Sequence, residues 1–116
     1  RRDGRYLVGR RPGGKRHGGL WEFPGGKIRP GESDREAAAR ELREELALTV
    51  VGLGRTLHRA RDAGSPFVIE FVEVEVGASD PRPIEHDELR WCEPGELLEL
   101  ALAPTDAVFA RSLVPD

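Results

Sequence analysis

Three glutamates close together in the sequence are the first residues whose types and spacing could do chemistry. Glu41, Glu44 and Glu45 stand at i, i+3 and i+4, so a helix would bring their carboxylates to one side. Like charges at this spacing repel one another by about a few tenths of a kcal/mol per pair, so stability alone does not favour the pattern. Mg²⁺ prefers oxygen ligands and is held by a few carboxylates with water and substrate phosphates. The spacing therefore indicates a divalent-cation site.

The ordinary alternative is a solvated helix face crossed by salt bridges, because Arg40 and Arg43 lie among the glutamates. Two neighbouring features favour the metal site. Glu32 adds a fourth carboxylate just before the helix, and Pro24-Gly25-Gly26 offers free backbone carbonyls. Carboxylates and a glycine-turn carbonyl are suitable ligands for Mg²⁺, with Mn²⁺ as the alternative ion.

The element that must position the glutamates is a helix expected over residues 33–46. Ser33 or Asp34 can act as its N-cap, and alanines follow the first turn. Its apolar stripe is formed by residues at i, i+4 and i+8: Ala38, Leu42 and Leu46. We expect the three glutamates to lie roughly opposite this stripe.

Short strands are expected on both sides of this helix. They cover residues 6–9, 20–23, 48–57, 67–76 and 89–91. The apolar alternation changes phase within 67–76, which predicts a β-bulge near Phe71. Pro94 opens a helical turn, and Thr105 or Asp106 is expected to cap a last helix that runs to about Leu113. The order β-β-α-β-β-β-α is typical of an α+β sandwich around a mixed sheet.

Length and composition predict one compact domain over residues 1–116. The lone Cys92 excludes an intramolecular disulfide framework and a cysteine-based zinc site, and it fits a reducing, cytoplasmic location. The apolar runs are too short to span a membrane, and no signal-peptide pattern is present. Asp3-Gly4 is typical of a hairpin turn, so we expect the native chain to carry a further strand upstream of Arg1.

Charge is unevenly distributed along the chain. Residues 1–29 carry nine Lys or Arg against two acids, whereas the rest carries nine Arg against nineteen acids. A protein that binds duplex nucleic acid is usually basic overall, and the net charge here is −3. A cationic flank beside a carboxylate cluster suits a metal–polyphosphate complex, although uneven surface charge alone is common.

Residues 26–48 resemble the Nudix box, written G-x5-E-x7-R-E-U-x-E-E-x-G-U with U a bulky aliphatic residue. The sequence here is Gly26-x5-Glu32-x7-Arg40-Glu41-Leu42-x-Glu44-Glu45-x-Ala47-Leu48, in which every charged position matches. One position departs, because Ala47 replaces the glycine that ends the helix with a positive φ. An alanine in that conformation costs on the order of 1 kcal/mol.

The resemblance implies a Nudix α/β/α sandwich and an Mg²⁺-dependent hydrolase that cleaves a nucleoside triphosphate into the monophosphate and pyrophosphate. By resemblance, the metal ligands are Glu41, Glu44, Glu45 and the carbonyl of Gly25. Glu32 and Arg40 would orient these carboxylates by charge-assisted hydrogen bonds. Whether a box glutamate or a more distant one is the general base stays open.

The similarity continues outside the box and indicates the MutT-like branch. By resemblance, Phe23 would contact the base, Arg11 would touch phosphate or base, and Glu85 would be a further metal ligand or the base catalyst. Asp106 would read the nucleobase, and as an acceptor it suits an exocyclic amine such as that of cytosine or guanine. For each residue an ordinary role is the alternative: a core aromatic, a surface charge or a helix cap. His86 is assigned no role.

Residues 91–106 look most like the subgroup that hydrolyses CTP or dCTP and 5-modified pyrimidine triphosphates, and that often accepts 8-oxo-dGTP. This implies sanitation of the nucleotide pool, with no duplex nucleic acid or membrane as partner, by a monomer or a homodimer. One alternative is a Nudix hydrolase of dinucleoside polyphosphates, ADP-ribose, NADH or coenzyme A. Another is a non-catalytic Nudix-fold module, although such modules typically lose the box glutamates.

Overall fold

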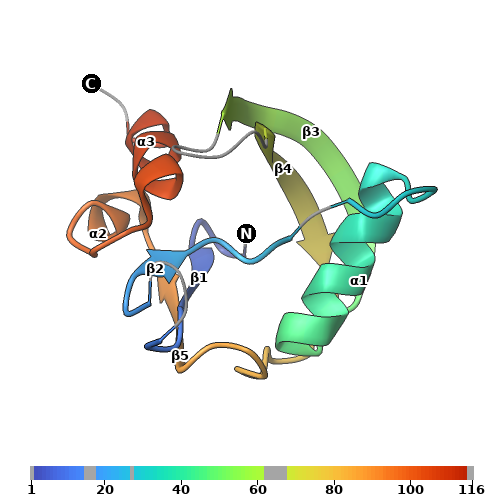
Figure 1. The fold of residues 1–116 in the computed structure, drawn as a ribbon, viewed down its shortest axis with the longest axis horizontal. Helices are drawn as coiled ribbons and strands as arrows, with labels where there is room; N and C mark the ends of the chain where they lie inside the picture. The colour runs from blue at the N-terminus through green and yellow to red at the C-terminus, as the bar shows by residue number, and fades with distance from the viewer. Residues whose placement is uncertain (1, 15–17, 27, 62–67, 115–116) are drawn as a thin grey trace.

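The computed structural model describes residues 2–14, 18–26, 28–61 and 68–114, which form five strands and three helices (Figure 1). The elements in chain order are β1 Tyr6–Arg10, β2 Trp21–Glu22, α1 Asp34–Leu46, β3 Val50–Arg61, β4 Val68–Val76, β5 Glu88–Cys92, α2 Pro94–Leu97 and α3 Pro104–Ser112. This is the predicted order with its brief helical turn at Pro94.

The strands form two sheets, one with the order β2-β1-β5 and one in which β3 pairs with β4. All these pairings are antiparallel. Within the described ranges, the parallel pairing is a single bridge between Trp21 and Leu102. The predicted α+β class is therefore confirmed, with the strands divided between two antiparallel sheets.

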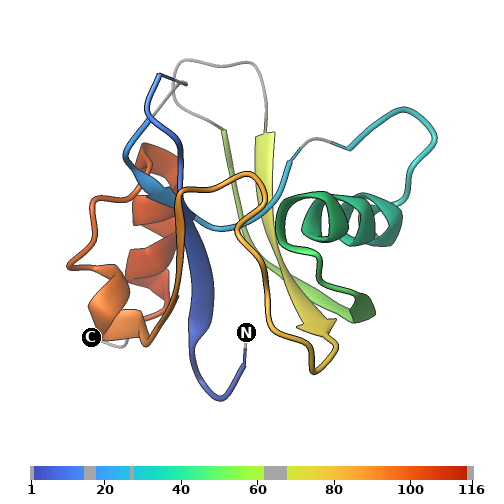
Figure 2. The ribbon, with the colours of Figure 1, turned by 90° about the horizontal axis from the view of Figure 1, so that it is seen from below.

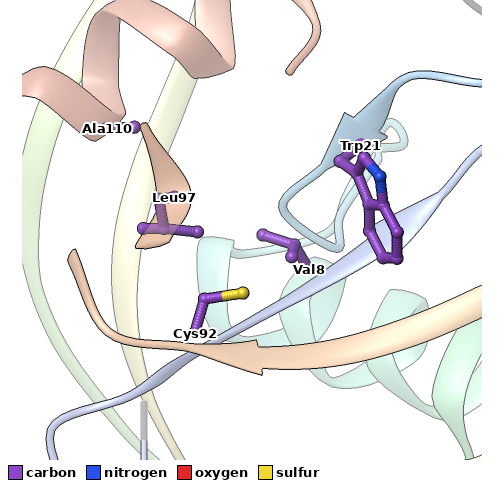
Figure 3. Close-up of a cluster of buried hydrophobic side chains, with 5 residues drawn as sticks. All are labelled: Val8, Trp21, Cys92, Leu97 and Ala110. Carbon is purple, nitrogen blue, oxygen red and sulfur yellow. The ribbon is translucent and has the colours of Figure 1, made fainter. Parts of the chain in front are cut away.

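The helices enclose the strands from two sides, which makes the α/β/α layers visible in Figure 2: α2 and α3 on one side, α1 on the other. Alternation along β1 explains why both sides are apolar. Leu7 packs in a cluster with Leu42, Leu46 and Leu48, while Val8 belongs to the opposite cluster. Figure 3 shows that second cluster, in which residues of three strands meet residues of α2 and α3: Val8, Trp21, Cys92, Leu97 and Ala110.

The bulge was predicted in the correct place but on the wrong strand. His58 pairs with Phe71 and Thr56 pairs with Val72. Between these two pairs β3 contains one residue more than β4. The extra residue therefore lies in β3, and the phase change along β4 is its consequence on the partner strand. Phe67, the expected first residue of β4, lies outside the described residues.

The predicted cap of the last helix was wrong. The N-cap is Ala103, and Pro104 is the first helical residue. Proline is favoured at that position because its missing N–H would have no partner there and its φ is already helical. Thr105 and Asp106 consequently lie inside the first turn, where both are buried.

The Asp3-Gly4 turn is confirmed. Asp3 and Gly4 have φ of 52° and 75°, and Arg2 and Arg5 exchange backbone hydrogen bonds of 2.9 and 3.0 Å. Positive φ at both central residues is typical of the type I′ hairpin turn. In the described residues, no helix is both long and apolar enough to cross a membrane.

Candidate active site

Helix α1 carries the glutamates, and local sequence determines both of its ends. Ser33 Oγ accepts a hydrogen bond from the backbone N–H of Glu36 at 3.1 Å, and Glu36 Oε1 accepts one from Ser33 N at 3.0 Å. This capping box confirms the predicted start. At the other end Ala47 has φ 55° and ψ 33°, so it adopts the left-handed conformation that the motif assigns to glycine.

The predicted faces of α1 need a correction. Glu45 is only 4% exposed and is not opposite the apolar stripe. Successive residues are about 100° apart around a helix, so Glu45 lies only about 60° from Leu42. Ala37 is buried, whereas Ala38 is only partly buried. Of the three glutamates, Glu44 is the one exposed to solvent.

Arg40 holds three carboxylates at once. Its Nε lies 2.7 Å from Glu32, and its terminal nitrogen lies 2.6 Å from Glu41 and 3.4 Å from Glu44. Hydrogen bonds from Arg40 and from the backbone N–H of Arg29 lower the pKa of Glu32 to about 2. The orienting role of Arg40 and Glu32 stays a prediction, which these contacts make possible.

A small open pocket of about 130 Å³ lies beside this cluster. It is lined by Arg11, Pro12, Glu22, Gly25, Glu41, Glu45, Glu85 and His86. The fold thus brings five of the predicted site residues to one pocket from four separate stretches of the chain. Glu44 and Arg40 adjoin it through the Arg40–Glu41 contact but do not line it.

Glu45 is the most strongly perturbed group in the pocket. Burial, then a hydrogen bond with Glu41 and the negative charges of Glu41, Glu22 and Glu85, raise its pKa to about 9. Its Oε2 is buried and has no hydrogen-bond partner. A buried acceptor without a partner costs on the order of 1–3 kcal/mol, so this position is not optimised for the stability of the metal-free protein.

Besides Pro12, two polar pocket residues, Glu22 and His86, were not predicted as site residues from the sequence. Glu22 Oε2 lies 3.2 Å from Arg11, and Glu22 Oε1 lies 3.3 Å from Nε2 of His86. The alternation of β2, which buries Trp21, could have placed Glu22 on the other face. His86 offers no such signal, because only the tertiary fold brings its loop against α1.

Phe23 and Asp106 lie together but do not line this pocket. Phe23 N donates a 2.8 Å hydrogen bond to Asp106 Oδ2. The Phe23 ring packs at 5.8 Å from Phe71 and 5.2 Å from Phe109, measured between ring centroids. The predicted base contacts of Phe23 and Asp106 therefore stay predictions, placed next to each other by the fold.

The residues present fit a hard divalent cation. The donors are carboxylates and a backbone carbonyl, one buried carboxylate oxygen has no partner, and the site carries excess negative charge. Gly26 leaves room for this cluster, since a side chain there would clash with the Glu41 carboxylate. Among the described residues, no three acidic, His or Cys side chains already stand as a ligand set. The carboxylates would therefore have to move closer together to bind a cation.

Comparison with known proteins agrees with this architecture. The NUDIX domain model matches residues 1–113. The chain is 41% identical over 106 residues to a CTP pyrophosphohydrolase of Escherichia coli, covering 90% of this chain and 78% of that protein. It is 36% identical over 101 residues to a putative 8-oxo-dGTP diphosphatase 2 of Mycobacterium tuberculosis, covering 82% and 72%.

Among solved structures, one from work on MutT of Aliivibrio salmonicida and Vibrio cholerae superposes with a TM-score of 0.80 at 28% identity. It covers 95% of this chain and 85% of that one. The domain match, the similar proteins and the carboxylate helix beside its pocket agree on one assignment. The chain belongs to the Nudix hydrolase family.

Proposed function

We propose that this protein hydrolyses nucleoside triphosphates to the monophosphate and pyrophosphate in a divalent-cation-dependent reaction. The observation that carries the proposal is the gathering of Glu41, Glu45, Glu85 and Gly25 around one pocket that Arg11 also lines. Carboxylates and a cation at one small site suit a polyphosphate bound through metal ions. The similar proteins named for CTP and 8-oxo-dGTP cleavage support the same class of substrate.

Each residue would have a task in this reaction, and Glu44 is a candidate for two. Glu41, Glu44, Glu45 and the Gly25 carbonyl would hold Mg²⁺, or Mn²⁺ in its place. A bound divalent cation would neutralise phosphate charge and lower the pKa of an attacking water. Arg40 keeps the carboxylates in place through its contacts with Glu32, Glu41 and Glu44.

The remaining tasks belong to residues on the pocket wall. Arg11 would pair with a phosphate, although it must leave Glu22, which lies 3.2 Å away, to do so fully. Glu85 or Glu44 would take the proton from the attacking water. Both are exposed, so either can exchange that proton with solvent.

We further propose a cytosine or an oxidised guanine nucleotide as the substrate. Asp106 supports this, because an ionised carboxylate only accepts hydrogen bonds and would therefore prefer an exocyclic amine. The hydrogen bond from Phe23 N fixes Asp106 beside an aromatic side chain that could pack against a base. Such a substrate and the single, buried, unpaired Cys92 fit a cytoplasmic enzyme.

The test is an initial-rate panel with Mg²⁺ that separates pyrophosphate from orthophosphate. The panel includes the standard nucleoside triphosphates, 5-substituted dCTP, 8-oxo-dGTP, a dinucleoside tetraphosphate and ADP-ribose. We expect pyrophosphate release, fastest with a cytosine or 8-oxoguanine nucleotide, and its loss in Glu44→Gln. Predominant orthophosphate, a preference for ADP-ribose or the dinucleotide, or full activity in Glu44→Gln would contradict the proposal.

A further inference from the structure

His86 is the buried residue of the pocket whose presence the proposed reaction does not explain. Its side chain is 3% exposed, and its Nδ1 is buried without a hydrogen-bond partner. An apolar residue would avoid that unpaired nitrogen, so packing alone gives no reason for a histidine here. The polar atom that does make contacts is Nε2.

Nε2 of His86 lies between two carboxylates. Glu22 Oε1 is 3.3 Å away and Glu45 Oε1 is 3.8 Å away. A carboxylate can only accept a hydrogen bond, so the contact with Glu22 places the hydrogen on Nε2. The N–H group is therefore a donor set between two acidic side chains that would repel each other when both are ionised.

The fold holds the His86 ring at this place from two directions. The ring lies on Gly9 of β1, where an added Cβ would come within 2.6 Å of the ring carbons. Its loop is tied down by backbone hydrogen bonds from Asp87 N to Arg10 O at 3.0 Å and from Ile84 N to Glu45 O at 3.1 Å. The loop is thus bonded both to β1 and to the end of α1.

We propose that His86 is a positioning residue for the metal-binding carboxylates. By donating Nε2–H to Glu22 it separates Glu22 from Glu45, and it keeps both carboxylates at the pocket. The contact between Arg11 and the other oxygen of Glu22, at 3.2 Å, holds Glu22 from the opposite side. The inference rests on the proposed function, because it assumes that Glu45 binds a divalent cation.

The experiment compares two replacements of His86 that differ in the donor. Gln places an amide N–H near the position of Nε2, whereas Phe keeps the ring and loses the donor. Mg²⁺ and Mn²⁺ affinity is measured by calorimetric titration without nucleotide, and folding is checked by thermal unfolding in a chelator. Residues that orient metal ligands typically change metal affinity by about 10–100-fold when they are lost.

We expect His86→Phe to weaken cation binding by at least about tenfold while it unfolds no more easily than the wild type, and His86→Gln to stay within about threefold. Glu22→Gln should weaken binding to a similar degree, and the double variant with His86→Phe should lose no more than either alone. Gly9→Ala, which displaces the ring, should imitate His86→Phe and serves as the second route if the Phe variant does not fold.

Wild-type affinity in His86→Phe, or an equal loss in the Gln and Phe variants, would overturn the positioning role while leaving the proposed function intact. A wild-type protein that binds neither Mg²⁺ nor Mn²⁺, with or without nucleotide, would instead overturn the proposed function. The two failures are therefore distinguishable.

Discussion

The two ends of helix α1 follow different physical rules. At the start, the capping box satisfies the free backbone N–H groups, and Asp34 and Glu36 lie where the helix dipole favours negative charge. At the end, Glu45 is buried with an unpartnered oxygen and a raised pKa, and Ala47 has a left-handed backbone. The features at the start of α1 stabilise the fold, whereas those at its end lower the stability of the metal-free protein.

This difference indicates where the helix serves function. A sequence that agrees with local rules over most of an element and violates them at one place commonly does so at a working site. On α1 the buried Glu45 is such a violation, and it lines the pocket together with Glu41, Glu85 and Gly25. Substitutions of pocket residues near the end of α1 should therefore change activity most. Substitutions at its start should change mainly the free energy of unfolding.

The largest expected effect is on activity at the pocket end. Glu41→Gln should lower kcat/KM by about 10²–10⁴-fold, because it removes charge from a proposed metal ligand. Glu36→Gln is the matched control at the other end, since glutamine also completes a capping box, and its activity should stay within about twofold. The measurement is kcat/KM of both variants by steady-state kinetics with Mg²⁺. Equal values in the two variants would contradict a functional difference between the two ends of α1.

The second expected effect is a pH dependence of stability in the metal-free protein. The unfolded chain releases the Glu45 proton near its ordinary pKa of 4.5, whereas the folded protein keeps it until about pH 9. The free energy of unfolding should therefore fall as the pH rises between these values. Urea unfolding in a chelator across that range measures it, and Glu45→Gln should remove most of the slope. An unchanged slope in that variant would show that other groups cause it.

A smaller effect is expected from the stability end. Ser33→Ala removes the side-chain cap and should lower the free energy of unfolding by about 1 kcal/mol, or about 4 °C in Tm for a domain of this size. Its kcat should match the wild type below the unfolding transition. A loss of activity at a temperature where the variant is fully folded would mean that the cap also affects the pocket.

The smallest effect is expected at Ala47. Ala47→Gly relieves the left-handed strain at φ 55°. It also increases the conformational entropy of the unfolded chain, which offsets part of the gain, so the free energy of unfolding should rise by no more than about 0.5 kcal/mol. Thermal unfolding measures the gain, and Mg²⁺ affinity should not change. A destabilised variant would show that the alanine methyl group packs favourably enough to outweigh the strain.

What could be predicted from the sequence was mostly local. The start and the end of α1 depend on residues within one helical turn. The sequence offered Ser33 or Asp34 as the N-cap, and the structure has Ser33. The motif assigns a left-handed residue to position 47, and Ala47 adopts that conformation. The predicted N-cap of α3 was wrong because Thr105 and Asp106 are typical capping residues, whereas Pro104 in fact opens the helix. That signal was available in the sequence.

Contacts between distant segments could not be predicted in this way. The burial of Glu45 and the placement of His86 depend on the loop between β4 and β5, whose Arg82 N and Ile84 N bond to the last turn of α1 at 2.8 and 3.1 Å. The bulge opposite Phe71 lies in β3 because pairing between two strands decides it. No pattern within one segment encodes such a partner.

The most direct test of the account is to locate a divalent cation in the folded protein. We propose crystals soaked with Mn²⁺ and a non-hydrolysable nucleoside triphosphate, with the ion found by its anomalous scattering. The account predicts Mn²⁺ bound by the Glu45 carboxylate and the Gly25 carbonyl, with the phosphate chain between the ion and Arg11. An ion bound elsewhere, with neither Glu41 nor Glu45 among its ligands, would contradict the account.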